Sequence, residues 1–151
     1  MPDPSQVGLE LDTVNFPVER GKVREFARAL HESDPIYVNA EAASNAGFPA
    51  IPAPLTFAMS AMLWRERDAA IEDLGFDFKR LLHGGTTWEY VRPIVVGDEL
   101  TIKRTVAAVD EREGKRGGVM TFVTIDAEVT DAGGAVVARQ TDTLIQTGAS
   151  A

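Results

Sequence analysis

The sequence lacks cysteine, long apolar runs and an excess of basic residues, and each absence narrows the possible functions. With no cysteine among 151 residues, disulfides, thiol nucleophiles and cysteine-ligated metals are excluded. Acidic residues outnumber basic ones 23 to 15, so we expect neither nucleic acid nor an anionic membrane as a partner. The most apolar stretch, residues 54–64, is about half of the ~20 residues that a membrane span requires. The acidic N-terminus lacks the apolar centre of a signal peptide, and we expect a cytoplasmic protein.

Length and composition favour one globular domain with its own core. Hydrophobic residues make up 44% of the chain and charged residues 25%, which is close to ordinary globular proteins and far from disordered ones. No internal repeat and no linker of biased composition divides the sequence. We therefore expect residues 1–151 to form a single domain.

Two segments in the first half have the pattern of surface helices. From Val23, apolar residues recur at i, i+3, i+4 and i+7 among charged neighbours, which predicts an amphipathic helix over residues 18–30. Asp34-Pro35 follows and should end it, because a residue before proline is pushed out of the α region. Residues 40–46 predict a further short helical turn.

The segment LTFAMSAMLW, residues 55–64, is apolar nearly all round. A helix of this composition is expected to be buried on most of its sides. Charged residues return at Arg65, where we expect the helix to emerge into solvent before Leu74-Gly75 ends it. The sequence therefore predicts a long, central, buried helix.

The second half of the chain has the alternating pattern of strands separated by turns. Alternation from residue 119 to residue 129 is the clearest, and Gly-rich or charged turns flank it. Helices followed by a run of antiparallel strands indicate an α+β protein, in which the sheet must curl around the apolar central helix. The predicted strands are 88–90, 100–109, 119–129 and 136–145.

Two segments carry a resemblance to a known family. ESDPIYVNAEAASNAGFPAIPAPLTFAM (32–59) resembles the stretch that holds the catalytic loop of MaoC-like (R)-specific enoyl-CoA hydratases and 3-hydroxyacyl dehydratases, and LLHGGTTWEYVRPIVVGDELT (81–101) resembles their strand-turn-strand. The resemblance covers residues 16–147. It is closest to the non-catalytic N-terminal (FAS1-like dehydratase) halves of double-hot-dog hydratases and to small subunits of heterodimeric dehydratases. It implies a hot-dog fold, an antiparallel sheet wrapped around a long central helix.

The chain departs from the family's catalytic motif. Active members carry Gly-Asp-x-Asn-Pro-x-His, whose Asp and His flank the water that adds to an enoyl thioester. Aligned on residues 31–37, the Asp position holds Glu32 and the His position holds Tyr37. Histidine exchanges protons near neutral pH, whereas tyrosine, with an ordinary pKa of about 10, is a poor base there. The longer Glu32 side chain also moves its carboxylate by more than ~1 Å, which costs rate. We therefore expect the usual acid/base pair to be missing.

The resemblance also suggests positions for substrate contacts. Backbone N–H groups at the start of the central helix attract a carbonyl or anion, and in relatives this end faces the thioester. His83 before two glycines suggests a contact to the thioester or its pantetheine arm, although a structural histidine explains the pattern equally well. Glu32, Tyr37 and His83 remain the catalytic candidates. Arg112, Lys115 and Arg116 suggest a contact to CoA phosphates, but a solvated hairpin tip is favoured. The predicted substrate-binding residues are Pro54, Leu55, Thr56, Phe57, His83, Gly84 and Gly85.

The resemblance implies a subunit of an acyl-thioester hydratase/dehydratase. The ligand is then an acyl-CoA or acyl carrier protein thioester whose acyl group is fatty, steroid-derived or a short acid, and no cofactor or metal is expected. A catalytic MaoC-like partner chain would supply the missing Asp and His and share the substrate tunnel. The alternatives are a homodimeric hydratase that uses Glu32, Tyr37 or His83, a non-catalytic acyl-thioester binding module, and, less favoured, a thioesterase.

Overall fold

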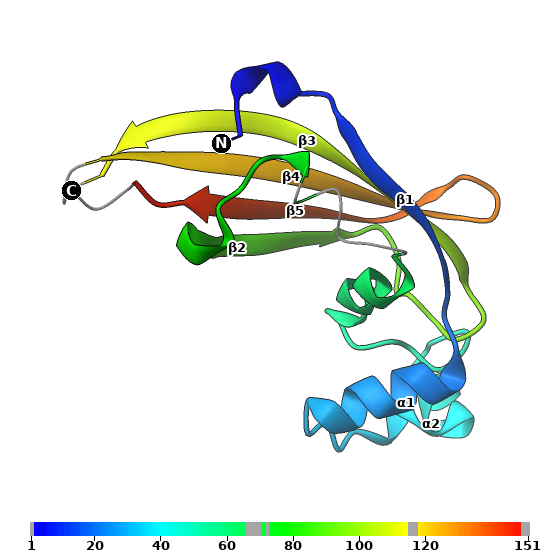
Figure 1. Ribbon diagram of the computed structural model, residues 1–151. Helices are drawn as coiled ribbons and strands as arrows, with labels where there is room; N and C mark the ends of the chain where they lie inside the picture. The colour runs from blue at the N-terminus through cyan, green and yellow to red at the C-terminus, as the bar shows by residue number, and fades with distance from the viewer. Residues whose placement is uncertain (1, 66–70, 72, 115–117, 149–151) are drawn as a thin grey trace.

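The computed structural model describes residues 2–65, 71, 73–114 and 118–148 (Figure 1). Its main element is a five-stranded sheet in which all neighbours are antiparallel, in the order β1-β3-β4-β5-β2. The strands β1 and β2 therefore form its two edges. The strands are β1 (Glu10–Pro17), β2 (Leu81–Tyr90), β3 (Glu99–Glu113), β4 (Val119–Asp131) and β5 (Val136–Gln146).

The four predicted strands are present, and the strand β1 was missed. Polar residues such as Asp12 and Asn15 break the hydrophobic pattern there, and only Val14 and Phe16 of this strand are buried. The predicted alternation on β4 is confirmed from Thr121 to Val129, where every second side chain is buried. The strand β4 thus has one face toward the core, as expected for a half-covered antiparallel sheet.

The helices α1 (Arg20–Ala29) and α2 (Ala40–Asn45) lie on one side of the sheet, near one of its ends (Figure 1). The helix α1 ends earlier than Asp34-Pro35, and His31 follows it with a positive φ of 57°. Asp34 instead caps the 3₁₀ helix η2 (Pro35–Tyr37), because its side chain accepts a hydrogen bond from the Ile36 N–H. The loop between α1 and α2 is thereby held in a compact turn.

The predicted central helix differs from expectation in its conformation and burial. Within the described residues this segment is a short 3₁₀ helix, η3 (Phe57–Trp64). Only Phe57, Ala58 and Ala61 are buried, whereas the residues Leu55 and Leu63 are 69% and 76% exposed. Among the described residues, the sheet covers one side of the segment, and the other side keeps large apolar side chains exposed. Residues 66–70 and 72, to which the prediction extended, lie outside the described residues.

An aromatic cluster joins the sheet to the helical layer. The Phe57 ring lies 5.4 Å from Phe16 of β1 and 5.5 Å from Phe26 of α1, and Trp64 meets Phe16 edge-on at 5.1 Å. Phe16 and Phe57 are almost fully buried. Rings at these separations pack favourably, so the cluster fixes η3 against the concave face of the sheet.

In the part of the chain that is described, no helix is long and apolar enough to cross a membrane.

Candidate functional site

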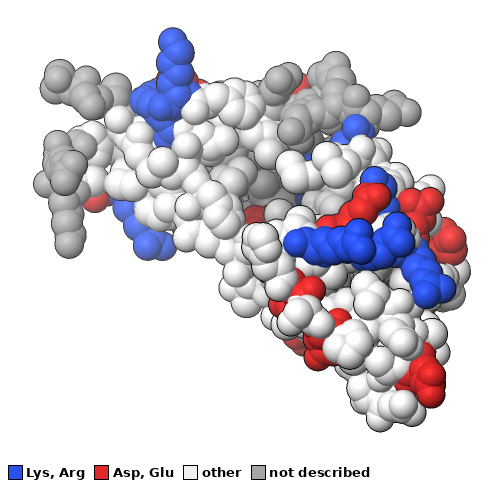
Figure 2. Space-filling model, turned by 90° about the horizontal axis from the view of Figure 1, so that it is seen from below, with Lys and Arg blue, Asp and Glu red and all other residues white. Residues whose placement is uncertain are grey.

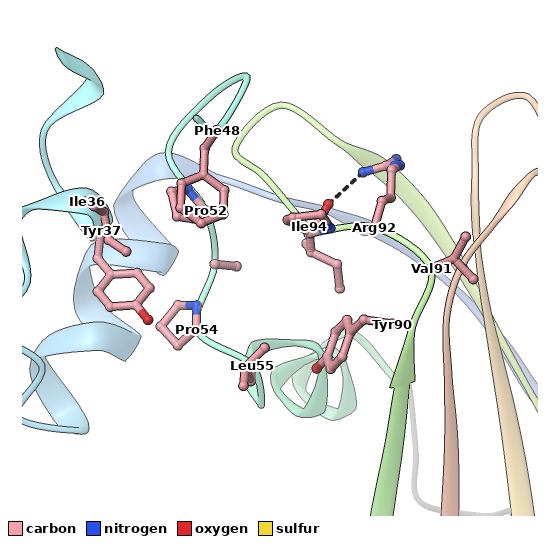
Figure 3. A pocket seen from close by; sticks show the side chains of 12 residues that line it. Ile36, Tyr37, Phe48, Pro52, Pro54, Leu55, Tyr90, Val91, Arg92 and Ile94 are labelled. Atoms are coloured by element: carbon pink, nitrogen blue, oxygen red, sulfur yellow. Dashed lines mark hydrogen bonds between the residues drawn. The ribbon is translucent and has the colours of Figure 1, made fainter. Parts of the chain in front are cut away.

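A cavity of about 270 Å³ is lined in part by Ile36 and Tyr37, which belong to the segment that resembles the family's catalytic loop (Figure 3). Its walls come from η2, from the Pro-rich segment before η3, and from the end of β2. Backbone hydrogen bonds join the last two walls, from Ala53 N to Ile94 O (2.8 Å) and from Val96 N to Ile51 O (2.9 Å). We call this cavity the tyrosine pocket; it is lined by Ile36, Tyr37, Phe48, Pro52, Ala53, Pro54, Leu55, Tyr90, Val91, Arg92, Pro93 and Ile94.

Two phenols face each other across this apolar lining. Tyr37 and Tyr90 lie on opposite sides of the pocket, with Pro54 and Leu55 between them (Figure 3). Burial raises the pKa of Tyr37, and the nearby charges of Glu32 and Asp34 raise it further. Burial also raises the pKa of Tyr90, to about 12. Both phenols are therefore protonated at neutral pH and can donate a hydrogen bond but cannot act as bases.

The Tyr90 hydroxyl is buried and has no hydrogen-bond partner among the described residues. Its ring is held by a stacked contact with Trp88, at 5.7 Å between centroids. A buried polar group without a partner is costly. Among the described residues that line the tyrosine pocket, Tyr90 thus carries a buried hydroxyl whose hydrogen-bonding capacity is not met.

Arg92, the one charged residue in this lining, is already paired. Its guanidinium donates to both carboxylate oxygens of Asp98, at 2.8 and 3.0 Å, and lies 3.7 Å from Asp131. The Asp98 carboxylate, and to a smaller extent Asp131, raises the pKa of Arg92. Asp98 also accepts the Val95 N–H at 2.9 Å. The pair fixes the turn that forms one wall of the pocket. Among the described residues, the lining contains no imidazole and no carboxyl group.

The structure separates the three catalytic candidates. Glu32 is exposed and does not line the pocket, but its negative charge contributes to the raised pKa of Tyr37. His83 lies at the other end of β2, in a second cavity of about 150 Å³ between η3 and the sheet. We call this second cavity the relay pocket; it is lined by Ala58, Met59, Ala61, Met62, Arg65, Ile71, His83, Ile102, Arg104, Ile125, Gln140, Asp142 and Leu144.

The predicted substrate-binding residues at the start of η3 are divided in the same way. Pro54 and Leu55 line the tyrosine pocket, and Thr56 is exposed beside them. Phe57 is only 1% exposed and belongs to the aromatic core. The Phe57 N–H, one of the groups expected to attract an anion, already donates to the Pro54 carbonyl at 2.9 Å.

The two glycines after His83 have a structural explanation. The pairing of β2 with β5 shifts register between His83 and Gly85, which is a β-bulge. A Cβ on Gly84 would lie 2.8 Å from the Ile145 Cδ1 atom, so only glycine fits without displacing that side chain. Of the predicted basic loop, Lys115 and Arg116 lie outside the described residues. The Arg112 guanidinium lies 4.7 Å from the centre of the Phe122 ring.

Sequence reasoning missed Tyr90 as a pocket residue, and it missed Thr86, Gln140 and Asp142. The alternation of Trp88, Glu89 and Tyr90 was a usable signal for Tyr90, because it places both rings on one face of β2. Gln140 and Asp142 lie two residues apart on β5, and Thr86 reaches Asp142 only through the pairing of β2 with β5.

Comparison with solved structures identifies the class of proteins that share this fold. A MaoC-like dehydratase superposes with a TM-score of 0.80 at 29% identity, over 96% of this chain and 43% of that chain. This chain thus spans less than half of that protein. The C-terminally truncated HadBC (3R-hydroxyacyl-ACP dehydratase) complex from Mycobacterium tuberculosis gives 0.72 at 26% identity, over 93% of this chain and 96% of that chain. The class is that of MaoC-like hot-dog dehydratases, and the predicted α+β hot-dog fold is confirmed.

The family follows from the sequence comparison. Residues 5–140 match the model of the FAS1-like, dehydratase domain region, and the chain belongs to this family. A UPF0336 protein from Saccharopolyspora erythraea is 38% identical over 149 residues, covering 97% of this chain and 92% of that protein. A UPF0336 protein from Streptomyces coelicolor is 39% identical over 115 residues, 74% of this chain and 76% of that protein. The resemblance described above is thereby confirmed, and the chain has a hydratase/dehydratase-type role.

Proposed function

We propose that this chain is the non-catalytic subunit of an acyl-thioester hydratase/dehydratase, acting on an enoyl or 3-hydroxyacyl thioester of CoA or of a carrier protein. One observation carries the proposal. Ile36 and Tyr37, from the segment that resembles the family's catalytic loop, line the tyrosine pocket, whose described lining offers two protonated phenols and no acid/base pair. Hydration needs one group that takes a proton from water near neutral pH. A partner chain would supply that group.

In the proposed complex, the tyrosine pocket contributes binding. The phenols of Tyr37 and Tyr90 are hydrogen-bond donors suited to a carbonyl oxygen, and Pro54 and Leu55 offer apolar contacts to a chain. Phenols donate without bringing a charge into the apolar lining. The proposal therefore assigns these four residues to substrate binding and assigns no catalytic group to the chain.

The surface of the chain supports a partner subunit. The strand β2 lies at a sheet edge, where its outer backbone groups have no strand beside them among the described residues. Leu82 on this strand and Leu63 of η3 are large apolar side chains left exposed. Wide areas on the helical side carry neither basic nor acidic side chains (Figure 2). An open edge with exposed apolar side chains invites pairing with another chain, and the related HadBC structure is a complex.

The proposal is tested by co-expressing the chain with a catalytic MaoC-like chain and following enoyl-thioester hydration by the purified complex. We expect the complex to exceed the partner alone, and Leu82→Glu on β2 to abolish co-purification. Val7→Glu is the matched control, because Val7 is also half exposed but lies before β1. A complex no more active than the partner alone would contradict the proposal. Ligand binding without turnover in the complex would indicate a binding module instead.

A further inference from the structure

A row of hydrogen-bonded polar side chains lies along the relay pocket, whose lining combines apolar residues with the charged side chains of Arg65 and Arg104. The Thr86 hydroxyl donates to Asp142 Oδ1 at 2.5 Å, and the Gln140 amide donates to Asp142 Oδ2 at 2.6 Å. His83 Nε2 lies 2.9 Å from the Thr86 hydroxyl oxygen. The row becomes more exposed toward His83, since Gln140 is 7% exposed as a residue while the Asp142 and His83 side chains are 17% and 60% exposed. The histidine is thus its outermost member.

The bulge at Gly84 is what brings His83 into this row. His83 and Thr86 are three residues apart, so strict alternation would place them on opposite faces of β2. The extra residue at the bulge reverses the alternation, and His83 pairs with Leu144 while Thr86 pairs with Asp142. Leu144 and Asp142 lie two apart on β5 and share a face, so His83 and Thr86 share it as well.

The hydrogen bonds fix the proton positions on His83. A threonine hydroxyl has one proton, and a carboxylate can only accept. Because Thr86 gives its proton to Asp142, its oxygen accepts the N–H of His83 Nε2. In the neutral imidazole the other nitrogen, Nδ1, is then an acceptor. Nδ1 has no partner among the described residues.

We propose that His83, oriented by Thr86 and Asp142, is a hydrogen-bond acceptor for a ligand whose apolar part lies against Met59, Met62 and Leu144. The ligand group that fits Nδ1 is a neutral donor, a hydroxyl or an amide N–H, attached to an apolar chain. The assignment rests on the proposed function for the ligand class, in which an acyl chain carries the hydroxyl and a pantetheine arm carries the amide. Gln140 also links the row to the apolar wall, because its amide lies 3.0 Å from the Met59 sulfur. Thr86 and Asp142 are positioning residues in this arrangement.

The first test reads the tautomer of His83 directly in the full chain. The sequence has two histidines, so ¹⁵N NMR of the imidazoles can be assigned with a His31→Gln variant. At alkaline pH, where imidazoles are neutral, we expect the proton of His83 on Nε2. Thr86→Val should move the signals toward a tautomer mixture, whereas Thr87→Val, on the opposite face of the same strand, should leave them unchanged. A wild-type proton on Nδ1, or equal effects of the two variants, would overturn the proposal.

The second test separates the two sources of the donor by measuring Kd for three probes. S-ethyl thiooctanoate has neither donor, its 3-hydroxy derivative adds the hydroxyl, and octanoyl-N-acetylcysteamine adds the amide N–H. We expect one donor to strengthen binding to the wild type by roughly three- to tenfold, the effect of one hydrogen bond. That gain should disappear in His83→Phe and Thr86→Val and persist in Thr87→Val. Equal affinity for the three probes, no binding of any, or a gain that survives in His83→Phe would overturn the assignment.

These tests can fail independently of the proposed function. The tautomer and the probe affinities are measured on the chain alone. Turnover by the complex with a catalytic partner is measured separately, so the His83 assignment can fail while the complex turns over, and the complex can fail to turn over while the probes bind.

Discussion

The tyrosine pocket and the relay pocket adjoin the same two segments, residues 54–64 and the strand β2, and differ in chemistry. The first lies at the loop where the family carries its catalytic motif, but its polar groups are phenols and a paired arginine. The second lies on the concave face of the sheet and is lined by His83 and Asp142, which the Thr86 hydroxyl joins through hydrogen bonds. The two pockets therefore separate an apolar lining with two protonated phenols from a lining that offers an imidazole.

The aromatic core beneath both pockets should give the largest effect on stability. Phe57→Ala removes a ring that is 1% exposed and packs on Phe16 and Phe26, so we expect the free energy of unfolding to fall by about 3–5 kcal/mol. Leu55→Ala changes only the rim of the tyrosine pocket and should stay within about 0.5 kcal/mol. Urea unfolding measures both. A loss of stability for Phe57→Ala as small as the loss expected for Leu55→Ala would contradict the assignment of Phe57 to the core.

The ion pair under the relay pocket should give the next effect. The Asp12 carboxylate accepts from Arg104 Nε at 2.8 Å and lies 3.2 Å from Arg65 Nε, and Arg104 is only 6% exposed. Asp12→Ala leaves a buried guanidinium without its partner and should lower the free energy of unfolding by about 3 kcal/mol. Glu10→Ala is the control, since Glu10 pairs with Lys103 on the surface of the same two strands, where ion pairs contribute little. An equal loss in the control would contradict the account.

The smallest effect concerns the phenols of the tyrosine pocket. The chain has two tyrosines, and an ultraviolet pH titration should show both ionising above the usual pKa, with Tyr90 near a pKa of about 12. Because the folded pKa of Tyr90 exceeds its unfolded value, its contribution to stability is complete below about pH 10 and is lost as the pH rises toward 12. Tyr90→Phe should remove the later ionisation and flatten this alkaline slope. Two ionisations near the ordinary pKa would place the phenols in solvent.

Much of the fold could be predicted because its periodicity is local. The helices and four strands follow from spacing alone, whereas β1 was missed because Asp12 and Asn15 mask its two buried residues. The burial of η3 was overestimated, because a segment that is apolar on all sides was expected to be enclosed by the sheet. Among the described residues, the sheet covers only one side of this segment. The position of Tyr37 followed from the motif. The row from His83 to Asp142 could not be predicted, because the bulge at Gly84 reverses the face that alternation assigns to His83.

The most direct test of the account is enoyl-CoA hydration by the purified, folded chain alone, followed through the conjugated thioester absorbance and validated on an active relative. The account predicts no turnover above buffer, because both phenols of the tyrosine pocket remain protonated and its described lining has no base. Turnover at an enzyme-like rate that is lost in Tyr37→Phe would contradict it and make this chain a catalyst in its own right.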